Sequence, residues 1–157
     1  MSRDNPAPRI GARIILVDAS ERVLLIHEQF DSHDTRREHW LTPGGGVEAG
    51  EDDLRLAAVR ELYEETGIEL VLPKGSPEVL RTRRLWNWQE LWFDQVDHFF
   101  LARVEDDLHI TPQGLTDVEQ QTLLGHRWWT LEELRATTET IIPAELADVL
   151  TELLRPA

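Results

Sequence analysis

The stretch GGGVEAGEDDLRLAAVRELYEETGI, residues 44–68, joins a glycine-rich turn to a single helical pattern. Ala58 and Leu62 lie four residues apart on one face of that pattern, so we expect a helix over residues 53–66. Gly67 follows at the position where a glycine commonly ends a helix in the left-handed conformation. The rest of the fold is expected to be arranged around this helix.

The same stretch is rich in carboxylates, which are Glu48, Glu51, Asp52, Asp53, Glu61, Glu64 and Glu65. At 100° per residue the last three fall within about 100° of arc, and Glu61 and Glu65 border the apolar stripe. Partly buried carboxylates raise one another's pKa or require a cation, and their oxygens favour Mg²⁺, Mn²⁺ or Ca²⁺. For the helix taken alone, a solvated acidic face is the alternative interpretation.

The stretch resembles the Nudix box, G-x5-E-x7-R-E-U-x-E-E-x-G-U, in which U is aliphatic. Its second half is matched without departure by Arg60-Glu61-Leu62-Tyr63-Glu64-Glu65-Thr66-Gly67-Ile68. In the first half, eight residues instead of seven separate Glu51 from Arg60. We favour a one-residue insertion between loop and helix, although Gly46-x5-Asp52-x7-Arg60 keeps the spacing with Asp in place of Glu. Whether Glu51 or Asp52 approaches a metal ion stays open at this point.

The resemblance implies a fold, an activity and a metal. The fold would be a Nudix-type αβα sandwich with a mixed β-sheet. The reaction would be hydrolysis of a nucleoside diphosphate linked to another group, as in a nucleoside triphosphate, an oxidised nucleotide, ADP-ribose or a nucleotide sugar. Mg²⁺ would be the cofactor, with Mn²⁺ as a substitute, and would lower the pKa of the water that attacks phosphorus.

The resemblance also assigns roles to residues. The metal site would draw on Glu61, Glu64, Glu65, Gly45 and Glu51. Arg60 would orient the glutamates through a bidentate contact. The general base would be Glu61 or, from a later segment, Glu119, for which a solvated loop is the favoured alternative.

Strands are predicted on both sides of the stretch. Residues 10–17 and 23–27 are rich in Ile, Val and Leu around a polar turn, which predicts a hairpin. Other strands are expected at 68–72, 79–84, 88–93, 98–104 and 125–130, with helices at 131–135 and from Pro143 onward. Residues 28–39 and 112–121 are expected to be loops. This order predicts the α/β (α+β) class with a mixed sheet.

Length and composition favour one globular domain. The chain has 157 residues, of which 41% are hydrophobic and 29% charged, and it contains no cysteine, which excludes disulfides and thiolate chemistry. Residues 1–9 are polar and contain two prolines, so a flexible N-terminal arm is expected before a single domain at 10–157. No apolar run approaches the length of a membrane span, so a cytoplasmic location is expected.

The formal net charge of −14 argues against a general binder of nucleic acids or anionic membranes. No stable nucleic-acid partner is therefore expected, and an anionic substrate would need a metal ion or local arginines. This charge also disfavours one alternative function, an RNA 5′ pyrophosphohydrolase. The other alternative is a non-catalytic, nucleotide-binding regulatory module on the same scaffold.

Residues that would contact the substrate are expected before and within the glycine loop. Arg36, Arg37 and Trp40 precede the glycine loop and, with Gly45 and Gly46, are the candidates. The alternative is a solvated basic loop in which Trp40 belongs to the core.

Strand parity predicts which face of a strand each of the later arginines and tryptophans occupies. Arg81 and Arg83 share one face of a strand, and Arg84 points the other way. An exposed, charge-protected edge strand is favoured for them over phosphate binding. Trp86, Trp88 and Trp92 have the same parity, for which a packed core or a homodimer face is favoured over a base-stacking surface.

Overall fold

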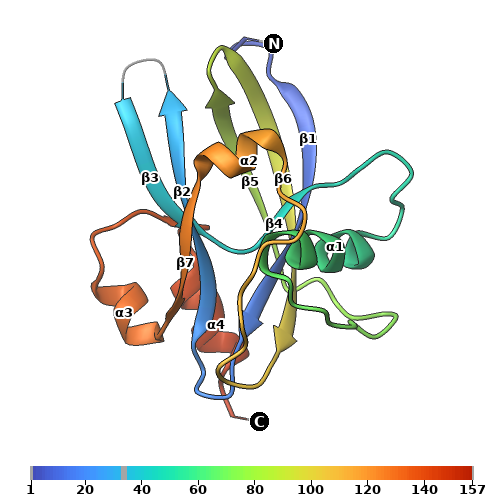
Figure 1. The fold of residues 1–157 in the computed structure, drawn as a ribbon, viewed down its shortest axis with the longest axis vertical. Coiled ribbons are helices and arrows are strands. Elements are labelled where there is room, and N and C mark those ends of the chain that lie inside the picture. The colour runs from blue at the N-terminus through green and yellow to red at the C-terminus, as the bar shows by residue number, and fades with distance from the viewer. Residues whose placement is uncertain (1, 33–34, 157) are drawn as a thin grey trace.

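The computed structural model describes residues 2–32 and 35–156, apart from the side chains of residues 30–37, 118 and 121. A mixed β-sheet forms its centre, with helices on both faces (Figure 1). The elements in chain order are β1 (Ala7–Val17), β2 (Val23–Ser32), β3 (Thr35–Leu41), β4 (Gly44–Gly46), α1 (Leu54–Thr66), β5 (Leu80–Trp88), β6 (Leu91–Arg103), α2 (Asp117–Thr122), β7 (Leu123–Trp129), α3 (Leu131–Ala136), β8 (Ile141–Ile142) and α4 (Leu146–Leu153).

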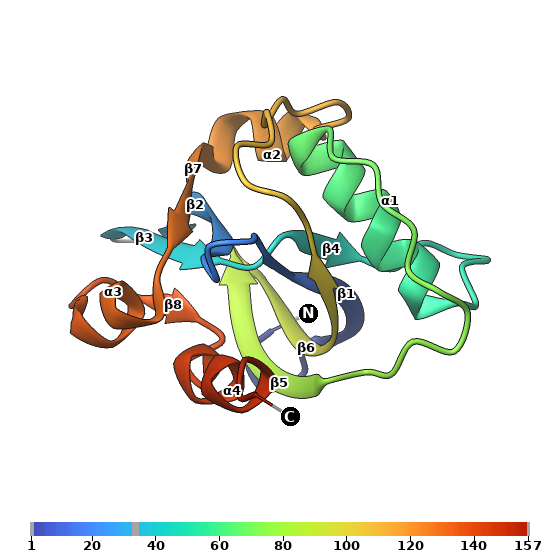
Figure 2. The ribbon, with the colours of Figure 1, turned by 90° about the horizontal axis from the view of Figure 1, so that it is seen from below.

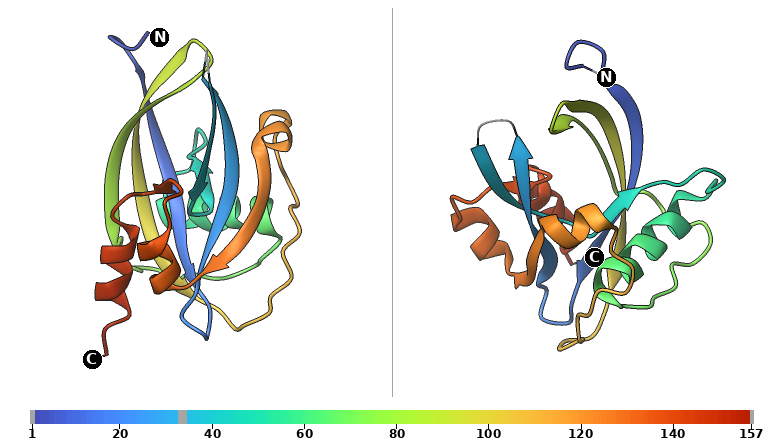
Figure 3. Two further views of the ribbon diagram at one scale, coloured as in Figure 1. Left: turned by 90° about the vertical axis from the view of Figure 1, so that its left-hand side faces the viewer. Right: turned by 45° about the horizontal axis from the view of Figure 1, so that its top comes forward.

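The sheet has the order β5-β6-β1-β2-β3-β8, with β4 paired to β1 and β7 paired to β2. Strand β1 runs parallel to β6 along its whole length, from Ala7↔Phe93 to Val17↔Arg103. By contrast, β1 and β2 are paired at Val17↔Val23, next to the turn that joins them. The two halves of the sheet therefore diverge away from this turn, as the upper part of Figure 1 and the right panel of Figure 3 show.

Alternate residues of β1 enter two separate hydrophobic clusters. Ile14 and Leu16 pack with α1, whereas Ile15 and Val17 pack with α3 and α4. Figure 2 and the left panel of Figure 3 show α1 on one side of the sheet and α3 and α4 on the other. A strand covered on both faces must be apolar throughout, which explains the continuous apolar run at its end. The predicted αβα sandwich with a mixed sheet is confirmed.

Helix α1 ends where the sequence predicts and begins at Leu54, one residue after the expected start. The Asp53 side chain accepts a hydrogen bond from the Arg55 N–H at 3.1 Å and so caps the first turn. Gly67 ends the helix with φ 74°, and its N–H donates to the Tyr63 carbonyl. Leu62 is fully buried against the sheet, so the apolar stripe faces the core.

Two expected boundaries are wrong because strand pairing extends further than apolar composition indicates. Strand β1 begins at Ala7, where it pairs with Phe93, so residues 7–9 are not part of a flexible arm. The segment 28–39 is not a loop. Its polar residues continue β2 and begin β3 in an antiparallel hairpin, with Glu28 opposite His39.

Other expected elements are also corrected. Residues 112–121 contain the start of α2, which a capping box between Thr116 and Glu119 initiates. Residues 68–72 form no strand, although Ile68 and Leu72 are buried against α1. Helix α4 begins at Leu146 instead of at the expected proline.

The hairpin turn between β5 and β6 lies at residues 89–90. Trp92 is therefore on β6 opposite Asn87, while Trp86 is opposite Phe93. Because residues paired across a ladder share a face, Trp86 and Trp88 face one side and Trp92 the other. The expected common face of all three tryptophans is wrong for Trp92.

Candidate active site

Arg60 ties the glycine loop to helix α1. Its Nε and Nη2 donate to the two carboxylate oxygens of Glu51, each at 2.8 Å, in a bidentate pair. Its Nη1 donates to Glu61 and Glu64, both at 3.0 Å, and Nη2 also donates to the Gly46 carbonyl at 3.1 Å. One guanidinium thus orients three carboxylates and the loop backbone.

The contacts of Arg60 decide between the two acidic residues that precede the helix. Glu51 reaches Arg60, and this hydrogen bonding holds the pKa of Glu51 below its ordinary value. Asp52 is exposed and outside this network in the described part of the chain. Asp53 caps α1, so of the two preceding acidic residues it is Glu51, not Asp52, that the structure pairs with Arg60.

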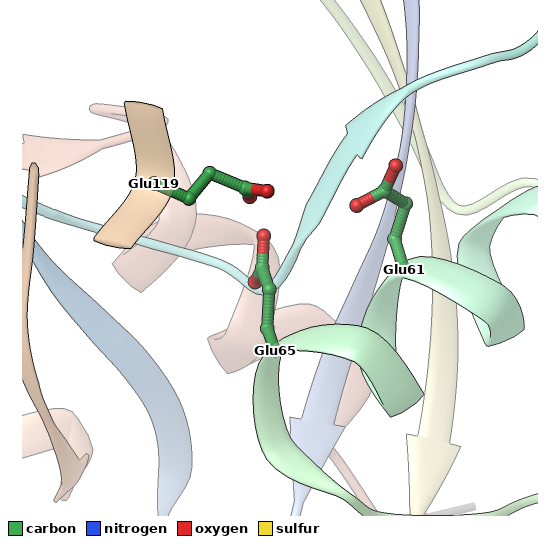
Figure 4. Close-up of side chains that lie close together, drawn as sticks. All are labelled: Glu61, Glu65 and Glu119. Atoms are coloured by element: carbon green, nitrogen blue, oxygen red, sulfur yellow. The ribbon is translucent and has the colours of Figure 1, made fainter. Parts of the chain in front are cut away.

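Three carboxylates converge in what we call the carboxylate cluster: Glu61 and Glu65 from α1 and Glu119 from α2 (Figure 4). Each offers one oxygen, and these oxygens lie within 4.8 Å of one another. The four-residue spacing puts Glu61 and Glu65 on one face of the helix. Glu119 comes from a capped helix instead of a solvated loop, and Glu64 points to Arg60 instead of joining the cluster.

Burial governs the electrostatics of the cluster. It raises the pKa of Glu61 to about 7 and the pKa of Glu65 well above its ordinary value. Both residues are only 7% exposed. Buried, crowded carboxylate oxygens are the donor set that Mg²⁺ or Mn²⁺ fits, because a divalent ion can replace the protons that otherwise relieve their repulsion.

The glycine loop passes directly over this helix face. A Cβ at Gly45 would lie 2.5 Å from the Glu61 Oε2, so a side chain there would displace the carboxylate. The Gly44 N–H donates to the Glu65 Oε2 at 3.2 Å. Glycine at position 45 therefore leaves the Glu61 carboxylate in its place over the helix face.

The carboxylate cluster lines one side of a pocket of about 410 Å³ that lies between the diverging halves of the sheet. Glu28 on β2 and Gly46 also line it. Strands β1, β5 and β6 contribute the opposite side, which consists of Arg9, Arg13, Arg84, Trp86, Trp88 and Phe93.

Sequence reasoning missed most of that opposite side. The sequence signal for Arg84 is its strand parity, because Arg84 points to the opposite face of the strand from Arg81 and Arg83. Arg9 escapes prediction because the polar composition of residues 1–9 indicates an arm. Glu28 escapes prediction because the polar composition of residues 28–39 indicates a loop.

The other predicted substrate contacts have different surroundings. Trp40 stacks on His27 with ring centroids 4.3 Å apart and meets the edge of Trp129 at 5.2 Å. It is outside the described lining of the pocket and has the core position that was its alternative. Arg36 and Arg37 lie on β3, and their side chains are outside the described residues.

Residues 7–150 match the NUDIX domain family model. The chain belongs to the Nudix family. Among curated Nudix relatives, Nudix hydrolase 25 from Arabidopsis thaliana is 37% identical over a 105-residue alignment that covers 60% of this chain and 58% of that protein. An RNA pyrophosphohydrolase from Caulobacter vibrioides is 32% identical over 156 residues, covering 89% of this chain and 80% of the relative.

Solved structures share the Nudix fold. A MutT protein from Methanosarcina mazei Go1 has a TM-score of 0.61 at 19% identity, covering 94% of each chain. The NUDIX domain of Shewanella oneidensis NrtR, solved with ADP ribose, has a TM-score of 0.61 at 16% identity, covering 98% of this chain and 92% of that one. Within the described residues, no helix is both long and apolar enough to cross a membrane.

Proposed function

We propose that this Nudix chain is a pyrophosphohydrolase that cleaves a nucleoside diphosphate linked to another group, with Mg²⁺ as its cofactor and Mn²⁺ as a substitute. The cluster of buried Glu61 and Glu65 with half-buried Glu119 carries this proposal, because its three oxygens converge in a pocket beside arginines. The names of the curated relatives support hydrolysis of phosphorus anhydrides. The intact cluster speaks against a purely regulatory, non-catalytic module.

The chain's own residues would bind the metal, position the carboxylates and accept a proton. Glu61, Glu65 and Glu119 would hold the metal, which when bound would neutralise phosphate charge and lower the pKa of a water molecule. Arg60 keeps Glu61 and Glu64 in place and anchors the glycine loop. Glu61 and Glu119 are the candidates for accepting the proton of the attacking water, since both face the pocket.

The substrate is proposed to be a small nucleotide, with nucleoside triphosphates first. A pocket of about 410 Å³ has the size typical of small-molecule sites. The Caulobacter relative favours a second candidate, the 5′ end of an RNA. The net charge of −14 makes contact with a long polyanion unfavourable. A cytoplasmic location and a homodimer stay predictions.

The test is a substrate panel assayed with Mg²⁺ and with Mn²⁺, with products resolved by phosphate position. The panel contains nucleoside triphosphates, ADP-ribose, nucleotide sugars and a 5′-triphosphorylated RNA. We expect hydrolysis of a small nucleotide and its complete loss in excess EDTA. Turnover that persists in EDTA would contradict the proposal, and a clear preference for the RNA would select the second candidate.

The buried carboxylates also predict a pH dependence of stability. Burial raises the pKa of Glu61 from 4.5 to about 7, so between these values the folded chain holds a proton that the unfolded chain has released. The free energy of unfolding without metal is therefore expected to fall as pH rises from about 4.5 to about 7. Urea unfolding of wild type and Glu61→Gln in EDTA measures this, and the variant should show the shallower fall. Equal slopes would contradict the assignment.

A further inference from the structure

We propose that Arg9, Arg84 and Trp88 form a metal-independent subsite for the nucleoside monophosphate part of the substrate, on the side of the pocket opposite the carboxylate cluster. The inference rests on the proposed function for the substrate being a nucleotide. The two guanidinium groups would hold a phosphate, and the indole would stack on the base.

Strand register brings the two arginines together. Gln95 on β6 is paired with Arg9 on β1 and with Arg84 on β5, so the three residues form one row across the sheet. Residues in such a row share a face, and each neighbouring pair has Cβ atoms about 5 Å apart. Both guanidinium carbons approach the ring of Trp86, at 5.4 Å for Arg9 and 5.5 Å for Arg84. A guanidinium above an aromatic ring keeps its N–H edge available for an anion.

Internal ion pairs leave most N–H groups of the two arginines available for a ligand. Among the described side chains, no carboxylate lies within 4.0 Å of Arg9. Arg84 pairs with Asp97 through Nε alone, at 3.3 Å. A partly buried guanidinium without a full set of partners is costly, and a bound phosphate would supply them. Gly46 makes room for Arg9, because a Cβ there would lie 2.8 Å from its Nη2.

A buried network fixes this side of the pocket before any ligand arrives. The Trp86 Nε1 donates to Gln95 at 2.8 Å, and the Gln95 Nε2 donates to Asp97 at 2.6 Å. Gln95 and Asp97 are each 1% exposed. Arg13 is occupied by Asp97 and by the Thr42 carbonyl, so it supports the network instead of reaching the ligand. A preorganised site loses little entropy on binding.

Trp88 completes the subsite. It has the same parity on β5 as Arg84 and Trp86, lines the pocket, and immediately precedes the hairpin turn. Within the described part of the chain, its ring is not stacked on another aromatic ring. A pocket-facing indole without a stacking partner is suited to a nucleobase, which it would recognise with little sequence preference.

In the experiment, AMP, GMP, CMP and UMP are each titrated into the full chain in excess EDTA. Binding is monitored by calorimetry and by tryptophan fluorescence. We expect at least one monophosphate to bind, and Arg9→Gln, Arg84→Gln and Trp88→Ala each to raise its Kd about tenfold. Arg83→Gln is the matched control. Arg83 lies next to Arg84 but is exposed and paired with Asp94, so the Kd should not change.

Hydrolysis with Mg²⁺ is measured in parallel, so the two proposals fail separately. Monophosphates that bind the arginine variants as tightly as wild type, or that bind only with a metal, would overturn the subsite even if turnover is normal. If the variants weaken monophosphate binding in EDTA but the wild type hydrolyses no nucleotide, the subsite is supported and the proposed function is contradicted. Arg84→Lys and a thermal unfolding scan of each variant separate loss of charge from loss of fold.

Discussion

A Glu65→Gln variant is expected to lose roughly a hundredfold to a thousandfold in kcat with Mg²⁺. The side chain is buried, and one of its oxygens lies in the carboxylate cluster with Glu61 and Glu119. Glutamine keeps the shape but removes the charge that a divalent ion would need. Because burial raises the pKa of Glu65, the substitution should not lower stability near neutral pH. Steady-state kinetics and calorimetric Mn²⁺ binding measure the two consequences.

Two companion variants sharpen this prediction. Glu69→Gln changes an exposed glutamate just beyond the same helix and should leave both readouts unchanged. Glu64→Gln should cost less than Glu65→Gln, because Glu64 is bound to Arg60 instead of lying in the cluster. A larger loss for Glu64→Gln would restore the sequence-based assignment of Glu64 as a metal ligand. Wild-type turnover in Glu65→Gln would remove the cluster from the mechanism.

An Arg60→Gln variant is expected to lower the free energy of unfolding by about 3 kcal/mol and the Tm by about 6 to 12 °C. Arg60 is 24% exposed and bonds to Glu51, Glu61 and Glu64. Its removal leaves these carboxylates facing one another without a counter-charge, and it releases the loop at Gly46. Urea and thermal unfolding in EDTA measure the loss.

Arg81→Gln provides the comparison for that stability measurement. Arg81 is exposed and pairs with Glu78 at the surface, an interaction of the kind that contributes little to stability. If Arg60→Gln unfolds no more easily than Arg81→Gln, the network around Arg60 does not hold the loop to the helix. Saturating Mg²⁺ is expected to reduce the difference in unfolding free energy between wild type and Arg60→Gln, since the cation replaces part of the lost positive charge.

Sequence patterns predicted the elements whose evidence is local. Helix α1 was predicted with its terminal glycine, because periodicity and a helix-ending glycine act over a few residues. The hairpin at the start of the sheet and the helix after residue 130 were predicted for the same reason. Composition misled where polar residues form strands, as in the β2–β3 hairpin, because backbone pairing there is independent of apolar character.

The sequence by itself determined that Glu61 and Glu65 share a helix face and that Arg60 lies beside them, since 3.6 residues per turn fixes both. Only the tertiary structure brought Glu119 to that face and aligned Arg9 with Arg84. The physical reason is distance along the chain. Helical geometry acts between neighbours, whereas Arg9 meets Arg84 through the register of β1, β6 and β5, which is set by packing of the whole sheet.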